Sequence, residues 1–562
     1  MIIKLITVAV HCVLLLGSIS GHNVSAQQAT PVRAEKSPLC TRENALDMIK
    51  QQIALTKTGD YLFRRATVLI RAADLLWPYD QEKAGATFAE AYALAVEQEE
   101  ENDRAGPRSV ILRMEYPDYR YVVIRAIAKR DSAWTRELTQ QILKPDRKRS
   151  TPRDDFHDLL TSERLLQLAR EMLATDINTA VDLFTISLNY PASPMLTRFL
   201  YSLAVVNQPL ADQLYAQALA VYSDKPIREF LYLQAYPFAW RDVLNTPIFV
   251  FFFEIPVNVV EKNRSLQRQL VQTMLRRAQQ IEVSWDEADS YRDPSGRVLP
   301  GALHLLRGLL RLEPKVRESF PDLLPPLIEV RDKILVSLSA EWQNILLRPE
   351  REISVTGDAS LRAHLSEWLY FDRATTAIRN NQLDEAETLT AKVEGLEQRA
   401  YLHTEIARGL LRHDGTHARK LLDDAVNEAK KAGVSIFTAR TLLTASNLYA
   451  KIDPNRSIEL LSDAVNCINH IDTPDFYKDD QTLVKNAKGK TRGGMYGGEY
   501  DLRFFMPGLD PERAFREMAK IDFDTALLQS SALTDKLQRS LATLSLAEVC
   551  LAQTSPKPES KQ

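Results

Sequence analysis

The segment Asp414-Gly-Thr-His-Ala-Arg-Lys-Leu-Leu-Asp-Asp-Ala425 carries the pattern that decides the fold. Asp414 follows an apolar stretch, the small residue Ala418 stands four positions later, and Leu422 and Ala425 continue the same helical face. An Asp in this place accepts hydrogen bonds from the first free N–H groups of a helix. A small side chain one turn inside that helix lets a neighbouring helix approach closely. The pattern therefore predicts a helix that begins after the acidic residue and packs tightly on its neighbour.

Eight degenerate copies of this pattern run along the chain, six with Asp at the first position and six with Ala at the second. The copies are Asp80 and Ala84, Asp131 and Thr135, Asp176 and Ala180, Asn207 and Ala211, Gln382 and Ala386, Asp414 and Ala418, Asp453 and Ser457, and Asp522 and Ala526. Apolar stretches of helical length, such as 165–174 and 402–411, precede the copies. Each unit is then a helix-turn-helix hairpin, and stacked hairpins bury faces that none could bury alone. We expect an all-α, right-handed solenoid of such hairpins.

The second helix of the unit resembles that of tetratricopeptide repeats (TPR), in which Ala, an aromatic residue and Ala follow one another at intervals of four and three. The matching positions are Ala84, Phe88 and Ala91 in the first copy, and Ala211, Tyr215 and Ala218 in the fourth. The intervals between copies are irregular. The resemblance implies a diverged TPR-like solenoid whose concave groove binds a protein segment or a peptide.

The N-terminus predicts export. Lys4 precedes an apolar run at 5–16, and Val24-Ser-Ala26 is a small-residue cleavage site, as in a secretory signal. We expect a periplasmic or extracellular protein.

The predicted organisation is a signal peptide (1–26), a disordered mature N-terminus (27–39), N-terminal helical repeats (40–240), an irregular Pro-rich helical middle (241–355), C-terminal helical repeats (360–552) with an insertion (473–511), and a disordered tail (553–562).

The mature chain keeps three cysteines, Cys40, Cys467 and Cys550, so it forms at most one disulfide. Their spacing leaves the pairing open. Cys550 lies on an apolar helical face, which is typical of a small buried hydrophobic residue.

Composition excludes several partners. Lys and Arg number 71 against 74 Asp and Glu, a net charge of −3, which argues against a strongly basic nucleic-acid binder. The apolar run 247–253 is too short to span a bilayer, so we expect core burial there and no transmembrane segment after signal removal.

The insertion 473–511 separates two copies of the repeat. It is rich in glycine and then alternates apolar and polar residues, which predicts a β-hairpin. Long loops inside compact domains are often functional. The candidate partner-binding residues are Lys490, Arg492, Met495, Tyr496, Tyr500, Arg503 and Phe504. The alternative is a structural flap that covers the end of the solenoid.

Catalytic signatures are weak. The chain has no HExxH and no Gly-x-Ser-x-Gly motif. His413 and His417 could share a helical face as metal ligands, but Asp414 places them at a turn, which favours solvated histidines. Trp285 beside Asp286, Glu287 and Asp289 resembles a sugar-binding cluster. We therefore expect a non-catalytic scaffold without a cofactor or metal; the alternative is a carbohydrate-active helical (α/α) enzyme. Neither the partner nor the oligomeric state follows from the sequence.

Overall fold

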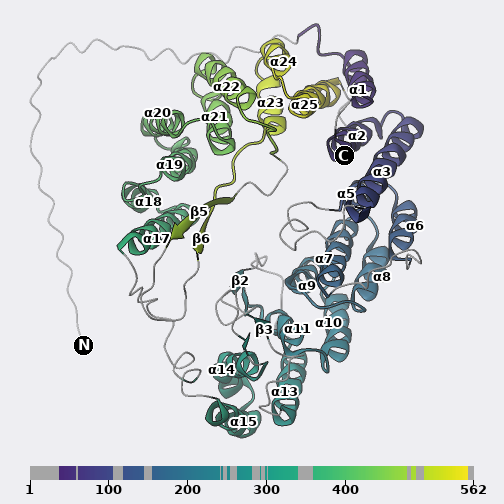
Figure 1. Ribbon diagram of the computed structural model, residues 1–562, viewed down its shortest axis with the longest axis vertical. Helices are drawn as coiled ribbons and strands as arrows, with labels where there is room; N and C mark the ends of the chain where they lie inside the picture. The colour runs from purple at the N-terminus through teal and green to yellow at the C-terminus, as the bar shows by residue number, and fades with distance from the viewer. Residues whose placement is uncertain are drawn as a thin grey trace, which may run out of the picture.

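The computed structural model describes residues 37–58, 61–104, 118–144, 155–240, 242–244, 250–252, 263–281, 291–292, 298–299, 301–338, 343, 359–476, 482–488 and 499–554. These residues form an all-α solenoid in which helical hairpins follow one another around a curved array (Figure 1). The predicted fold class is confirmed.

The second helix of every hairpin begins at the residue after the first position of the repeat pattern. These helices are α3 (Gln81–Arg104), α6 (Ser132–Leu143), α8 (Ile177–Ser187), α10 (Gln208–Tyr222), α18 (Leu383–Thr390), α20 (Gly415–Ala432), α22 (Pro454–Asn469) and α24 (Phe523–Ser531). All eight predicted helix starts are therefore confirmed.

The acidic residues act as helix caps. The side chain of Asp176 accepts hydrogen bonds from the backbone N–H groups of Asn178 and Thr179, and Asp414 accepts one from His417. Asp80, Asp131, Asn207, Asp453 and Asp522 cap their helices in the same way. Gln382 begins α18 without a side-chain cap.

The small residue at the second position is fully buried in every copy. In six copies it is Ala, and the core places these Ala side chains where helices meet. In the α21/α22 hairpin it is Ser457, whose hydroxyl donates to the Ser446 carbonyl at 2.7 Å, while the Ser446 hydroxyl donates to the Ser457 carbonyl at 2.8 Å. The two helices are thus close enough for reciprocal hydrogen bonds between side chain and backbone.

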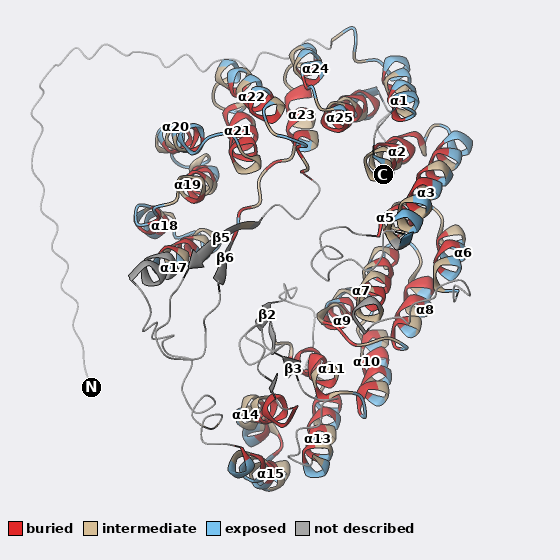
Figure 2. Cartoon of the chain, viewed as in Figure 1, coloured by how far each residue is buried: buried red, intermediate tan, exposed pale blue. Residues whose placement is uncertain are grey.

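The first helices of the hairpins supply the other layer of the array. They are α2 (Leu62–Leu76), α5 (Tyr119–Ala128), α7 (Asp155–Met172), α9 (Pro194–Val206), α17 (Ala359–Arg379), α19 (Leu396–Leu410), α21 (Ile436–Tyr449) and α23 (Pro511–Ala519). Helices α5, α7, α9, α19 and α21 lie on the inner side of the curve, and α6, α8, α10, α20 and α22 lie on the outer side (Figure 1). Figure 2 shows buried residues between the layers and exposed residues on the outer helices.

The middle of the chain continues the array without the repeat pattern. Its elements are α11 (Ile227–Leu231), a 3-10 turn (Tyr232–Gln234), α12 (Ala235–Phe238), α13 (Arg264–Gln280), α14 (Gly301–Ser319), a second 3-10 turn (Pro321–Leu323) and α15 (Leu324–Ser337). One buried apolar cluster extends from Ala66 to Leu338. The core therefore runs without interruption past residue 240. Most of the apolar run 247–253 lies outside the described residues.

Three antiparallel two-stranded pairs complete the described elements: β1 (Asp242–Leu244) with β2 (Val250–Phe252), β3 (Tyr291–Arg292) with β4 (Val298–Leu299), and β5 (Thr482–Lys488) with β6 (Glu499–Phe505). Within the described parts of the chain, no helix combines the length and apolar content required to cross a membrane.

The first and last described helices of the chain meet in space. Helices α1 (Arg42–Thr56) and α2 pack against α25 (Lys536–Thr554), and we call the interface of α1 and α2 with α23 and α25 the seam (Figure 1). The stack of hairpins thus runs from α17 to α25, crosses the seam to α1, and continues to α15. The first and last described helices, α1 and α25, thus lie in the middle of the stack rather than at its ends.

A disulfide between Cys40 and Cys550 joins the two sides of the seam. The interpretation of Cys550 as only a small buried hydrophobic residue is therefore wrong, because the sequence cannot show that a residue 510 positions away lies beside it. Cys467 is a buried free thiol. Residues 37–39, assigned from composition to a disordered end, form a turn before Cys40, and α25 extends to Thr554.

Candidate functional site on the inner face

The insertion forms the predicted β-hairpin. Strands β5 and β6 pair in antiparallel register, with Leu483 opposite Phe504. The hairpin contacts α17 on the inner side of the array (Figure 1). Phe504 is fully buried and meets the Phe371 ring edge-on, with ring centroids 5.3 Å apart. This aromatic contact fixes the hairpin on α17.

The predicted partner-binding residues of the insertion are placed differently from one another. Tyr500 and Arg503 lie in β6, where their backbones pair with Ala487 and Val484. Phe504 is buried, so its ring belongs to the core and not to the surface. The other predicted residues, Lys490, Arg492, Met495 and Tyr496, lie outside the described residues.

After β6 the chain runs along α21 as an extended segment, residues 506–510, which we call the inner strap. The Leu509 backbone N–H donates to the Thr444 hydroxyl at 3.1 Å, and Met506 and Leu509 are buried. Gly508 lies so close to α21 that an added Cβ would come within 2.8 Å of the Cβ of Arg440. A side chain at position 508 would therefore push the strap away from the helix.

The chain that leads into the insertion is also held on the inner side of the helices. The Gln538 side-chain amide donates to the Pro474 carbonyl at 3.0 Å, and Arg440 donates to the Phe476 carbonyl at 3.4 Å. The Arg440 guanidinium also lies 5.7 Å from the centroid of the Phe476 ring. Both flanks of the insertion are thus fixed to helices of the array, the first to α21 and α25 and the second to α21.

A small open pocket remains between α19, α21 and the inner strap. It is open to solvent, and Tyr401, Glu405 and Phe437 line it together with Met506 and Gly508. Its aromatic rings beside a carboxylate and hydroxyl groups offer both apolar contact and polar partners at the surface.

Burial changes the pKa values of two ionisable side chains that line this pocket, Glu405 and Tyr401. Desolvation raises the pKa of the Glu405 carboxyl, and Arg408, which donates to Glu405 at 3.0 Å, opposes that rise. Desolvation also raises the pKa of the Tyr401 phenol, and the nearby Glu405 carboxylate adds to the effect. Tyr401 therefore stays protonated and can donate a hydrogen bond at any physiological pH.

The histidines pair with carboxylates on neighbouring helices. His417 Nε2 lies 3.1 Å from Glu387, and His403 Nδ1 lies 2.9 Å from Glu428. His413 is exposed in the turn before α20. Among the residues with described positions, no group of three or more His, Cys, Asp or Glu side chains is arranged to hold a metal ion. The cluster of Trp285, Asp286, Glu287 and Asp289 lies outside those positions.

The inner strap was missed by the sequence analysis, which placed its candidate residues in the hairpin. One sequence signal did mark the strap. Pro507 and Gly508 follow the alternating residues of β6, and Asp510, which caps α23, stands soon after them. Leu509 between them is buried. The helix on which the strap lies could not be read from that signal.

Comparisons with known proteins assign no family to this chain. No protein-family model matches the chain, and no curated protein sequence matches it. A solved structure described as a circular tandem repeat protein with novel repeat topology and enhanced subunit contact surfaces is similar at 13% identity, over 91% of this chain and 99% of that chain, with a TM-score of 0.21. The helical-repeat architecture therefore rests on the chain's own helices.

Proposed function

We propose that this protein is an exported, non-catalytic helical-repeat scaffold that binds an extended polypeptide segment on the inner face of its C-terminal half. The observation that carries the proposal is the inner strap. There, the inner surface of α21 already holds an extended stretch of chain through a backbone hydrogen bond and a close approach at Gly508. Beside the strap, the open pocket lined by Tyr401, Glu405 and Phe437 leaves apolar and polar groups for a second segment.

Two further features support the proposal. The Ala84, Phe88, Ala91 and Ala211, Tyr215, Ala218 triplets are buried as in a diverged TPR-like array, a fold class that presents concave binding surfaces. The Cys40–Cys550 disulfide suits an oxidising compartment, since such bonds persist outside the cytosol. Export through residues 1–26 would deliver the chain to that compartment.

Site-specific photo-crosslinking tests the binding site. A benzophenone amino acid replaces the partly buried Phe437 at the pocket, and a matched variant carries it at Leu528, which is 69% exposed on the outer helix α24. We expect the pocket variant to crosslink to a discrete polypeptide that the outer variant does not capture. A Tyr401→Ala substitution should reduce that crosslink. No crosslink at position 437, or the same products at both positions, would contradict the proposal.

Export has a separate test. Mass spectrometry of the protein isolated from its native cells should find Gln27 as the first residue of the envelope or secreted fraction. A chain that keeps Met1 and fractionates with the cytosol would contradict export, while leaving the binding site open to the crosslinking test.

A further inference from the structure

The seam differs from the other junctions of the array because no peptide turn connects its two sides. Helices α1 and α2 come from the start of the chain, and α23 and α25 come from its end. Adjacent hairpins elsewhere, such as α19/α20 and α21/α22, are joined by short turns. The seam must therefore be held by contacts between residues that are more than 400 positions apart.

Apolar contacts form the first part of the seam. Ala45 and Ile49 of α1 and Ala72 of α2 belong to the same buried cluster as Leu544 and Val549 of α25. All of them have less than a tenth of their surface exposed. These residues form a shared core across the seam, so opening it would expose apolar surface on both sides.

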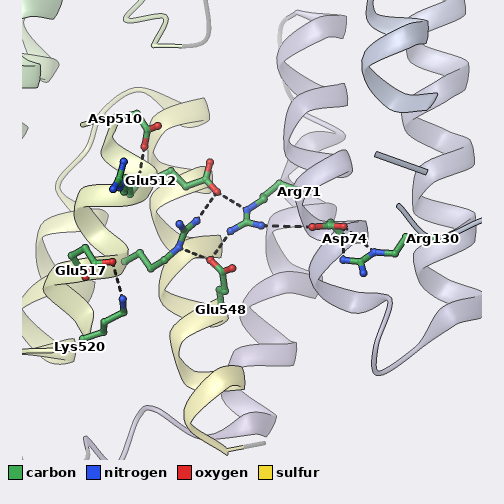
Figure 3. A network of polar contacts seen from close by, with 10 residues as sticks. Arg71, Asp74, Arg130, Asp510, Glu512, Glu517, Lys520 and Glu548 are labelled. Atoms are coloured by element: carbon green, nitrogen blue, oxygen red, sulfur yellow. Dashed lines mark hydrogen bonds and ion pairs between the residues drawn. The ribbon is translucent and has the colours of Figure 1, made fainter. Parts of the chain in front are cut away.

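Ion pairs form the second part, and Arg71 of α2 is at their centre (Figure 3). Its guanidinium lies 2.5 Å from Glu512 of α23 and 2.6 Å from Glu548 of α25. Glu548 also accepts from Arg516 at 2.6 Å, so cations and carboxylates alternate across the interface. Burial by itself lowers the pKa of Arg71, but Glu512, Glu548 and Asp74 together raise it above its usual value.

A second ion pair lies elsewhere along the seam. Arg64 of α2 donates to Asp535 at 2.6 Å, and the same carboxylate accepts the backbone N–H of Gln538 in the first turn of α25. Both side chains are less than a fifth exposed. The start of α25 is thus anchored to α2 by a residue that also caps the helix.

The disulfide is the only described covalent link across the seam. Cys40 stands just before α1, and Cys550 lies in α25, 510 positions further on. The Ser37 hydroxyl donates to Asp524 of α24 at 2.6 Å and keeps the turn before Cys40 against the C-terminal half. Without the disulfide, closing the seam requires two distant parts of the chain to meet, and the entropy of closing so long a loop opposes it.

We propose that the Cys40–Cys550 disulfide is a redox latch on the seam: the bond keeps α1 against α25, and when the bond is reduced the seam opens more often, although its apolar contacts and ion pairs still favour the closed stack. The bond forms when the two thiols transfer two electrons to a disulfide-bonded oxidant, which becomes a dithiol, and two protons pass from the cysteines to it. Reduction by a dithiol reverses each of these transfers. The hairpins away from the seam keep their own turns and the packing between their two helices in both states, so the opening is local.

Hydrogen exchange on the full-length protein tests the latch. Oxidised protein is compared with protein reduced by dithiothreitol, and peptides are read from residues 42–56 and 536–554 at the seam and from 415–432 and 454–469 away from it. We expect exchange at the seam to become at least about tenfold faster on reduction, with less than about a twofold change in α20 and α22.

Two variants show through which thiols the reductant acts. A Cys40→Ala chain should have fast exchange at the seam without reductant and no further change with it. A Cys467→Ala chain should respond like the natural sequence, because Cys467 is outside the disulfide. If Cys40→Ala does not fold, the comparison of oxidised and reduced natural protein still decides. Unchanged exchange at the seam, or an equal increase in all helices, overturns the proposal.

Discussion

The junction inside the α21/α22 hairpin and the seam between α2 and α25 achieve the same close packing by different means. The hairpin relies on a capping Asp453, a buried Ser457 and reciprocal hydrogen bonds with Ser446. The seam adds partly buried ion pairs around Arg71 and a disulfide. A short turn keeps two helices at high effective concentration, so small residues and a cap are sufficient. A junction without a turn has to be stabilised by specific contacts between its two sides.

The largest expected effect comes from a substitution that disturbs the packing inside a hairpin. Ala418 is fully buried in the core formed by α19 and α20. Ala418→Leu should lower the free energy of unfolding by about 1–3 kcal/mol, because the larger side chain forces the helices apart. Urea titration measures the loss. Gly415→Ala in the same helix is the control, since an added Cβ there meets no atom within 4 Å. If the two variants are equally stable, close approach at the second position is not required.

At the seam, Arg71→Gln removes the cation shared by Glu512 and Glu548. We expect a loss of about 1–2 kcal/mol in the free energy of unfolding, because two partly buried carboxylates lose a partner while Arg516 remains. Arg130→Gln is a matched control, since Arg130 pairs with one carboxylate, Asp74, and is more exposed. Equal losses in both variants would show that the position of Arg71 across the seam has no special importance.

Removing the helix cap at Asp176 should have a smaller effect on stability, and that effect should depend on pH. Hydrogen bonds from the Thr179 backbone and hydroxyl lower the pKa of Asp176. The cap therefore contributes fully above the carboxyl pKa of the unfolded chain, and its contribution is lost as pH falls through the lower pKa of the folded state. Asp176→Ala should cost about 1 kcal/mol at neutral pH. Asp176→Asn should retain stability at neutral pH and lose the acid-dependent part, as thermal unfolding between pH 7 and pH 3 would show.

The smallest expected effect on stability comes from a substitution that supplies the side-chain cap missing from α18. Gln382 is the one first-position residue among the eight copies without a side-chain cap in the structure. Gln382→Asp should raise the free energy of unfolding by about 0.5 kcal/mol, because it provides an acceptor for the first N–H groups of α18. Gln382→Ala should be nearly neutral. A destabilised Gln382→Asp chain would mean that the turn at Asn381, whose φ is 59°, holds the backbone away from capping geometry.

Local chemistry explains which predictions succeeded. The helix starts were predictable because a cap and the small residue one turn later are neighbours in sequence. The β-hairpin was predictable because its glycines and alternation are local as well. The location of the inner strap and the burial of Phe504 depend on α17 and α21, which lie far from the insertion in sequence. No spacing within the insertion encodes those partners.

By itself, the sequence determined where the hairpins begin, which face of each helix carries small side chains, and that one insertion departs from the helical pattern. Only the tertiary structure decided that the first and last described helices meet, that Cys40 pairs with Cys550, and that the stack runs through the seam. The physical reason is distance along the chain. Caps and periodicity act over a few residues, whereas Arg71 finds Glu512 and Glu548 only after the curvature of the whole array has brought them together.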